Sequence, residues 1–274
     1  SKLEKQALIL NINFEIICID DGSFSPKNEK NQKINLLTNS RFIESKKNIG
    51  RIKNRLLLAE KSQYQWLLFI DVDTNPINEN FLKNYINQKN NGAIFFGGCV
   101  FRESENINCS LRNKFGKNRE EINSSQRNKN PFKYISSNNF MCEKDLLVEI
   151  LSEIDSISYG NDYIFGAILK KKNVVVTHFD NPVLIEHIDE NSVFIQKTHQ
   201  ALYNIKNYHK KGKLQKHSIS ILKAYRFLDS FFMKKLFVEL SNIFMSKLEK
   251  NLHKENPNLF LFDLYRLNYL CKIN

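Results

Sequence analysis

The sequence has little of several residue types and segments that would place it in a specialised class of protein. Only 9 glycines and 5 prolines occur among its 274 residues, which excludes collagen-like and proline-rich low-complexity chains. No apolar run approaches the roughly 18 residues of a membrane-spanning helix, and the longest runs, such as residues 66–70, have the length of a strand. With 42% hydrophobic and 12% aromatic residues, the chain can bury a substantial core.

Cysteines are few, and their spacing carries no metal or disulfide motif. The 5 cysteines are an odd number, and no two of them have the C-x-x-C spacing, which argues against a disulfide framework and a zinc knuckle. The expected location is the cytoplasm, either free or at the inner face of the cytoplasmic membrane. The chain opens at Ser1 without a visible signal peptide, so its start does not decide targeting.

The charge is strongly positive and unevenly distributed. Lysines and arginines number 41 against 29 acidic residues, a net charge of +12. Residues 201–274 hold 14 basic and 5 acidic residues, so this part carries +9 and residues 1–200 only +3. An anionic partner is therefore expected at the C-terminal part, as a membrane surface or a charged lipid-linked acceptor. Nucleic acid is not expected, because no basic stripe with interleaved aromatics is present.

Strand-like and helical segments alternate over the first 200 residues. This alternation predicts an α/β fold with a mixed, mostly parallel sheet flanked by helices over residues 1–200, and a basic helical extension over residues 201–274. Two polar segments, 27–33 and 103–134, predict loops, the second of them long and mobile. The predicted strands are residues 14–19, 66–70, 93–101 and 174–177, and the predicted helices are residues 2–10, 50–59, 81–86, 143–154 and 163–169.

Two acidic pairs follow predicted buried strands. Asp20 and Asp21 follow one strand, and Asp71 and Asp73 follow the next. Ligands of open α/β sheets bind beyond the carboxyl ends of the strands, and residues two apart on an extended chain point to the same side. Asp71 and Asp73 could together reach one hard cation such as Mg²⁺ or Mn²⁺. The alternative is that these aspartates cap the turn that begins at Thr74.

Several short segments follow one another in order over about residues 1–200. They are Asp20-Asp21-Gly22-Ser23 after a strand, Asn48-Ile49-Gly50 with Arg55, the strand at 66–70 with Asp71-Val72-Asp73, Ser137-Asn138-Asn139-Phe140, Tyr159-Gly160-Asn161-Asp162, and His178-Phe179-Asp180-Asn181-Pro182-Val183. Their order resembles family-two glycosyltransferases of the bacterial surface-polysaccharide type, which have the GT-A fold.

The resemblance implies a role for each matched residue. The nucleotide would be bound by Asp21 on its base with Asp20 beside it, by Arg55 near its phosphates, and by Asp71 at the ribose or a metal-bound water. Asp73 would be the principal metal ligand and Asp162 the catalytic base, and Ser137, Asn138 and Asn139 would line the acceptor or donor sugar. From the residues alone, Asp162 could also be a helix N-cap.

The implied activity is metal-dependent, inverting transfer of a hexosyl or N-acetylhexosaminyl group from a nucleotide-diphospho-sugar, with a UDP-sugar expected. The acceptor would be a hydroxyl of a glycan or lipid-linked molecule in bacterial polysaccharide synthesis. Bound Mn²⁺ or Mg²⁺ would neutralise the leaving diphosphate. One carboxylate would deprotonate the acceptor at an oxocarbenium-like transition state.

The sequence departs from the family pattern at three points. The family's first strand is missing, because Ser1 begins within what would be the first helix. The usual Glu-Asp pair reads Asn161-Asp162. Ile185 stands where the family has a histidine, and His187, two residues later, is a candidate metal ligand or a histidine at a strand end.

Two basic segments leave their roles open. The segment 103–134 either folds over the diphosphate or is a solvated surface loop. Residues 217–245 have the pattern of an amphipathic helix pair with lysines between the apolar positions. These helices pack on the catalytic domain or on a second subunit of a homo-oligomer, or they attach the protein to an anionic bilayer.

Three other function classes compete with this interpretation. A sugar nucleotidyltransferase would also combine an α/β sheet with a divalent cation, but the glycine-rich phosphate-binding run of such enzymes is absent. A non-catalytic basic protein could bind nucleic acid. A degenerate transferase would bind its donor without turnover, as the altered Asn161-Asp162 segment allows.

Overall fold

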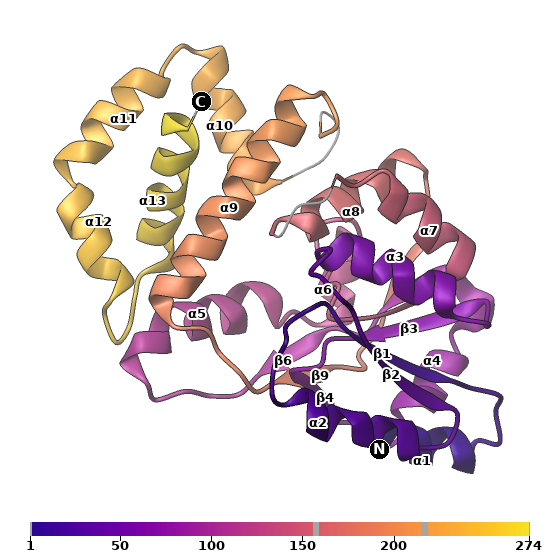
Figure 1. The fold of residues 1–274 in the computed structure, drawn as a ribbon. Helices are drawn as coiled ribbons and strands as arrows, with labels where there is room; N and C mark the ends of the chain where they lie inside the picture. Colours follow the sequence, from indigo (N-terminus) through magenta and orange to yellow (C-terminus); the bar gives the residue numbers. More distant parts are fainter. Residues whose placement is uncertain (1, 156–158, 215–218, 274) are drawn as a thin grey trace.

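The computed structural model describes residues 2–155, 159–214 and 219–273, which form an α/β part and a group of C-terminal helices (Figure 1). The strands are β1 (Ile16–Asp20), β2 (Ser40–Glu44), β3 (Trp66–Ile70), β4 (Thr74–Pro76), β5 (Ile94–Phe96), β6 (Cys99–Phe101), β7 (Asn139–Glu143), β8 (Val176–His178) and β9 (Val183–Ile185). The helices of the α/β part are α1 (Lys2–Ile9), α2 (Asn28–Asn31), α3 (Arg51–Lys61), α4 (Phe81–Ile86), α5 (Ser110–Phe115), α6 (Ser124–Lys129), α7 (Lys144–Ser152) and α8 (Asn161–Lys171). The C-terminal helices are α9 (Asn191–Lys210), α10 (Ser220–Ser230), α11 (Lys234–Ile243), α12 (Met245–Leu252) and α13 (Leu259–Lys272).

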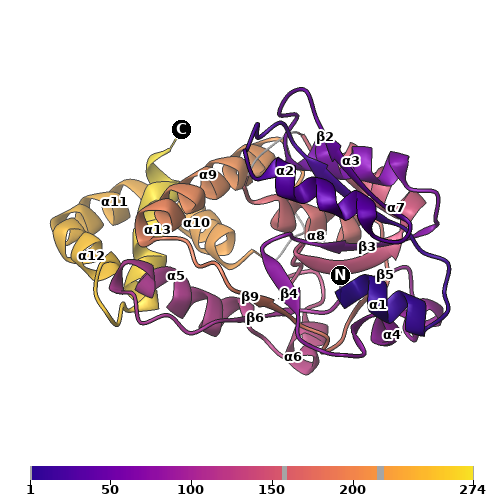
Figure 2. The same cartoon turned by 60° about the horizontal axis from the view of Figure 1, so that its bottom comes forward.

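The described strands form three small sheets with the orders β1-β2, β3-β7-β5-β8 and β4-β9-β6. Helices α3, α7 and α8 lie on one side of β3, and α1 and α4 lie on the other (Figures 1 and 2). The prediction of a mixed α/β fold with flanking helices is confirmed. Of the described pairings, β1–β2, β5–β8 and β6–β9 are parallel, whereas β3–β7, β5–β7 and β4–β9 are antiparallel. More of the strand pairings are antiparallel than expected, because β7 pairs antiparallel with both β3 and β5. Strand β7 was not predicted, since its first residues were interpreted only as a sugar-binding motif.

The segment 93–101 was predicted as one strand and is two. Strand β5 belongs to the four-stranded sheet and β6 to the three-stranded sheet. Gly97 and Gly98 lie between them, and Gly98 has a φ of 82°, in the left-handed region that favours glycine. A Cβ on Gly97 would lie 2.5 Å from the side chain of Asn139 and from the carbonyl of Asn181. The chain can therefore pass between the sheets only where side chains are absent.

The predictions of loops at 27–33 and 103–134 are wrong. The first segment contains α2 and a 3₁₀ turn at Gln32–Leu36, and the second contains α5, a π turn at Gly116–Glu120 and α6. These helices are short and mostly polar, so they lack the apolar periodicity that identifies longer helices.

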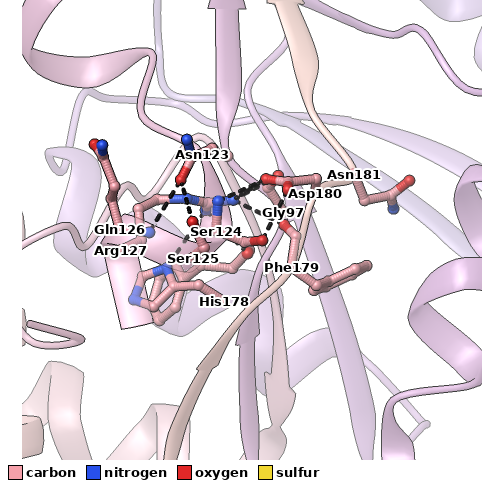
Figure 3. Close-up of polar contacts among 12 residues, drawn as sticks. Gly97, Asn123, Ser124, Ser125, Gln126, Arg127, His178, Phe179, Asp180 and Asn181 are labelled. Atoms are coloured by element: carbon pink, nitrogen blue, oxygen red, sulfur yellow. Dashed lines mark hydrogen bonds and ion pairs between the residues drawn. The ribbon is translucent and has the colours of Figure 1, made fainter. Parts of the chain in front are cut away.

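Arg127 of α6 fixes the second segment to the strands. Its side chain is 4% exposed and donates hydrogen bonds to the carbonyls of Phe96 at 3.2 Å and Phe179 at 2.8 Å. It also forms an ion pair with the Asp180 carboxylate at 3.2 Å (Figure 3). This carboxylate accepts hydrogen bonds from the Ser124 N–H and hydroxyl, both at 2.8 Å. A buried guanidinium with these partners makes the segment an integral part of the fold.

His178 at the end of β8 belongs to the same cluster and has a structural environment. Its ring nitrogen Nε2 lies 2.8 Å from the Pro131 carbonyl, and its backbone N–H donates to the Asn128 side chain at 3.0 Å. Burial, with the charge of Arg127 nearby, lowers the pKa of His178 to about 4. The ring is therefore neutral near neutral pH.

The C-terminal helices share one core with the α/β part. Leu202, Leu222 and Leu270 belong to the same buried cluster as Phe96 and Phe140. Helix α9 runs through the boundary that was predicted at residue 200, and α13 contacts α9, α10, α11 and α12. No helix in the described ranges is long and apolar enough to cross a membrane. Of the predicted amphipathic pair at 217–245, residues 217 and 218 lie outside the described residues, and α10 and α11 account for most of the rest.

Arg127→Ala should destabilise the protein strongly. The substitution leaves the carbonyls of Phe96 and Phe179 without their donor, and an unsatisfied or unpaired buried polar group costs on the order of 3 kcal/mol. Arg119→Ala is the matched control, because Arg119 pairs with Asp263 at the surface with half its side chain exposed, and such pairs contribute less than about 1 kcal/mol. Urea unfolding followed by circular dichroism measures both. Equal losses of free energy of unfolding would show that Arg127 is not a structural anchor.

Candidate functional site

The end of β3 supplies the first residue of the site. Asp71 follows Ile70, and its backbone N–H donates to the Asn138 carbonyl at 3.0 Å. The backbone then turns at once, because the Thr74 N–H and hydroxyl donate to the Asp71 carbonyl at 3.1 and 2.7 Å. This turn is the one expected of Thr74. It holds the backbone of Asp71 in place and leaves its carboxylate free to bind other groups.

Two arginines of α3 bind the Asp71 carboxylate, one on each oxygen. Arg51 Nη2 lies 2.5 Å from Oδ2, and Arg55 Nη2 lies 3.0 Å from Oδ1. Residues four apart lie on the same side of a helix, which brings both guanidinium groups to one carboxylate. Arg55 was expected near this site. Arg51 was missed, although its i, i+4 spacing from Arg55 was visible in the sequence.

Arg55 is the buried member of the pair. Its Nη2 also donates to the Ser137 carbonyl at 2.6 Å, and its guanidinium lies 5.9 and 5.8 Å from the ring centroids of Phe69 and Phe140. Burial is the main cause that lowers the pKa of Arg55, followed by the charge of Arg51. The group remains a cation, because an arginine is not deprotonated in proteins.

Asp162 lies in the first turn of α8 and joins the same cluster. The N-cap of α8 is Gly160, with a φ of 89°, so the alternative that Asp162 caps this helix is wrong. Burial is the main cause that raises the pKa of Asp162, whereas hydrogen bonding to Ser137 and the charges of Arg51 and Arg55 oppose it. The structure therefore brings Ser137, Asp162 and the two arginines together; three of these four residues, Arg55, Ser137 and Asp162, were candidate site residues from the motif order.

Asp20 and Asp21 shape the loop beside this cluster. Both oxygens of Asp21 accept backbone hydrogen bonds at 2.9 Å, from Ile49 and from Gly50, which is the N-cap of α3. Asp20 accepts from the Ser23 N–H at 2.9 Å, and hydrogen bonding with Ser23 is the main cause that lowers its pKa. Asp21 thus fixes the start of the helix that carries both arginines.

Asp73 and His187 come to the same end of a sheet. The pairing of β4 with β9 puts Thr74 opposite Ile185. Asp73 directly precedes Thr74, and His187 follows Ile185 by two residues; both are exposed. The negative charge of Asp73 also interacts electrostatically with Arg51. Among the described residues, no group of three or more His, Cys, Asp or Glu side chains could hold a metal ion by itself.

Asn138 and Asn139 have different environments. Asn138 is partly exposed and accepts from the Ser136 hydroxyl at 2.7 Å. Asn139 is fully buried: its Oδ1 accepts from the Tyr85 hydroxyl at 2.6 Å, and its Nδ2 donates to the Gly98 and Asn181 carbonyls at 2.8 and 2.9 Å. Its amide is therefore occupied in holding the strand ends together.

Solved structures with a similar fold exist at low sequence identity. The chain is similar to S. aureus TarS 1–349 with a TM-score of 0.50 and 14% identity, over 98% of this chain and 83% of that one. It is also similar to glucosyl-3-phosphoglycerate synthase from Mycobacterium tuberculosis in complex with Mn²⁺, UDP and glucosyl-3-phosphoglycerate, with a TM-score of 0.47 and 11% identity over 74% of each chain. No curated protein matches.

The sequence itself decides the family. Residues 3–151 match the family described as Glycosyl transferase family 2, which is more than half of the chain. The matched range contains both acidic pairs, the two arginines of α3 and the segment at 137–139. The mixed α/β fold agrees with this match, since the similarity to TarS extends over nearly the whole chain. The chain therefore belongs to glycosyl transferase family 2.

Proposed function

We propose that the protein is a metal-dependent, inverting glycosyltransferase that uses a nucleotide-diphospho-sugar, with UDP as the nucleotide. The observation that carries the proposal is the cluster of Arg51, Arg55, Asp71 and Asp162 at the end of β3, within a chain of glycosyl transferase family 2. Two cations beside a carboxylate whose pKa is raised can bind an anionic leaving group next to a base. This combination fits glycosyl transfer from a diphosphate.

The donor site extends from the β1 loop to α3. Asp20 and Asp21 line the base, and Asp71 lies at the ribose. Arg51 is 43% exposed at its side chain and pairs with Asp71, so it can turn to a diphosphate with little loss of buried contact. Arg55 stays in place, because it is held by the Ser137 carbonyl. The exposed arginine therefore binds the phosphates, and the buried one supplies a fixed positive field.

Asp73, with His187 beside it, would hold the divalent cation together with oxygens of the donor. Mg²⁺ and Mn²⁺ sites of this kind use one or two protein ligands and complete their shell with phosphate oxygens and water. The exposure of both residues and the β4–β9 register support this donor set. When bound, the cation neutralises the charge that develops on the leaving diphosphate.

Asp162 is the base of the reaction. It takes the proton from the acceptor hydroxyl while that oxygen forms its bond to the anomeric carbon, and the bond from this carbon to the diphosphate oxygen breaks on the opposite face. The diphosphate leaves with the electron pair, and the anomeric configuration is inverted. The raised pKa of Asp162 makes its carboxylate a better proton acceptor than an ordinary aspartate.

The acceptor and the cellular place belong to the same proposal. The acceptor is a hydroxyl of a glycan or a lipid-linked molecule in bacterial polysaccharide synthesis. Residues 1–200 form the catalytic domain, and residues 201–274 are a helical extension. Asn138 faces the sugars, with the buried Ser137 and Asn139 supporting it from the core. The protein acts in the cytoplasm or at the inner face of its membrane.

UDP binding should depend on Mn²⁺ and on Asp73. Isothermal titration calorimetry of the wild type should detect UDP binding with Mn²⁺ and a loss of at least about tenfold in affinity without it, because the cation joins carboxylate and phosphate. Asp73→Ala should show the same loss with Mn²⁺ present. Asp145→Ala, at the exposed start of α7, should bind like the wild type. Equal UDP affinity with and without Mn²⁺ would refute metal-dependent donor binding.

Arg51→Ala should weaken UDP binding without unfolding the protein. A charge-assisted hydrogen bond to phosphate contributes about 1.5–3 kcal/mol, which is roughly a tenfold or larger loss of affinity. Arg41→Ala is the control, because Arg41 is similarly exposed and pairs with Glu15. Calorimetry gives the affinities, and thermal unfolding gives the stability. Unchanged UDP affinity in Arg51→Ala would restrict Arg51 to its ion pair with Asp71.

Asp162→Asn should abolish transfer and preserve donor binding. Loss of a general base lowers the rate by a factor of about 100 or more, whereas UDP binding measured by calorimetry should persist. In the wild type, the acid limb of the pH–rate profile should lie above the ordinary aspartate pKa of about 3.9, because the base works only when deprotonated and its pKa is raised. If Asp162→Asn loses UDP affinity along with activity, Asp162 is a binding residue and not the base.

A further inference from the structure

One side of the C-terminal helices is both apolar and exposed. It comprises the end of α10, the turn that follows it and the outer side of α11, which Figure 1 shows at the edge of the molecule with α13 between α11 and α9. We refer to it as the α10–α11 apolar face. Its residues, each at least 40% exposed, are Phe227, Phe231, Phe232, Met233, Leu236, Leu240, Ile243 and Phe244.

The sequence of α11 explains why these side chains are exposed together. Leu236, Leu240 and Ile243 have the i, i+4, i+7 spacing that places them on one side of a helix. Ser241 marks the inner side, because Asn268 of α13 donates a hydrogen bond to its hydroxyl at 2.5 Å. Helix α11 has no buried residue, whereas α10 buries Leu222, Tyr225 and Leu228. Packing therefore explains the buried apolar residues of α10, whereas no described residue covers the apolar side of α11.

The helices that carry this face have a net positive charge. Residues 220–252 hold six lysines and arginines against three exposed acidic residues, Asp229, Glu239 and Glu249. Lys223, Lys235, Lys247 and Lys250 are exposed on α10, α11 and α12. Lys247 Nζ lies 5.6 Å from the ring centroid of Phe244, a member of this face. Residues 201–274 together carry a net charge of +9. An apolar patch with phenylalanines and flanking lysines fits the boundary of an anionic bilayer, where the apolar chains enter the acyl region and the lysines reach the headgroups.

We propose that the α10–α11 apolar face binds the surface of a bilayer that contains anionic lipids. The contact lies in the plane of the interface, since no described helix could span the membrane. The inference rests on the C-terminal helices alone and does not depend on the proposed transferase activity.

The test compares two charge substitutions with a matched control. The test variant is Leu240→Glu with Ile243→Glu, and the control is Leu36→Glu with Val175→Glu, which places the same charge on exposed residues of the α/β part. Cosedimentation uses vesicles of phosphatidylcholine, with and without phosphatidylglycerol. The wild type and the control should bind the mixed vesicles, and the test variant should lose about tenfold or more of its partition coefficient. Binding to pure phosphatidylcholine should be weaker by a similar factor, since the lysines are attracted only to an anionic surface.

Three results would overturn the proposal. The first is equal binding of the test variant and the wild type to mixed vesicles. The second is equal binding of the wild type to both kinds of vesicle. The third is a wild-type dimer in sedimentation velocity that the test variant dissociates, with no vesicle binding by either protein, which would identify the face as a contact between copies. UDP affinity of the test variant, measured in parallel, should equal that of the wild type, so a failure here stays separate from a failure of the proposed function.

Discussion

The pairing of the buried Arg55 guanidinium is the interaction on which the site depends. A buried cation must have its charge and its N–H groups satisfied, and Arg55 finds the Asp71 carboxylate and the Ser137 carbonyl. These partners tie α3 to the end of β3 and to the segment that leads into β7. Asp21 holds the N-terminus of the same helix, because both of its oxygens accept hydrogen bonds from the backbone at the helix start. The positions of Asp71 and Asp162 in the site follow from this framework.

A second buried guanidinium organises the opposite region of the α/β part by the same rule. Arg127 bonds to carbonyls at the ends of β5 and β8 and pairs with Asp180, beside the glycines where the chain passes from one sheet to the other (Figure 3). The amide of Asn139 connects the same strand ends from within. Backbone carbonyls just beyond the end of a strand have no hydrogen-bond partner in the sheet. Buried polar side chains supply the donors that these carbonyls need.

The candidate site and most of the excess positive charge lie in different parts of the molecule. The α/β part is nearly neutral, and its few cations near the site are paired with carboxylates, which suits a ligand that brings its own negative charge and a metal ion. The C-terminal helices carry most of the excess positive charge and the exposed apolar face. Figure 2 shows α11 and α12 at the opposite end of the molecule from α4 and α7. A surface contact at this end would leave the cluster around Asp71 accessible.

The sequence alone determined the family and the flanked α/β fold, because these depend on apolar strands that end in acidic residues and on the order of motifs. It also named Arg55, Asp71 and Asp162 as candidate site residues. The helices of segment 103–134 were not predicted, because their polar residues lack apolar periodicity. Arg51 and β7 were not predicted either, and β5 and β6 were predicted as one strand. Only the tertiary structure decided that Asn139 is occupied in the core and that the apolar residues of 217–245 divide between packing and exposure. Whether these side chains are buried depends on the neighbours that the folded chain brings to them. The spacing of residues within one segment does not specify those neighbours.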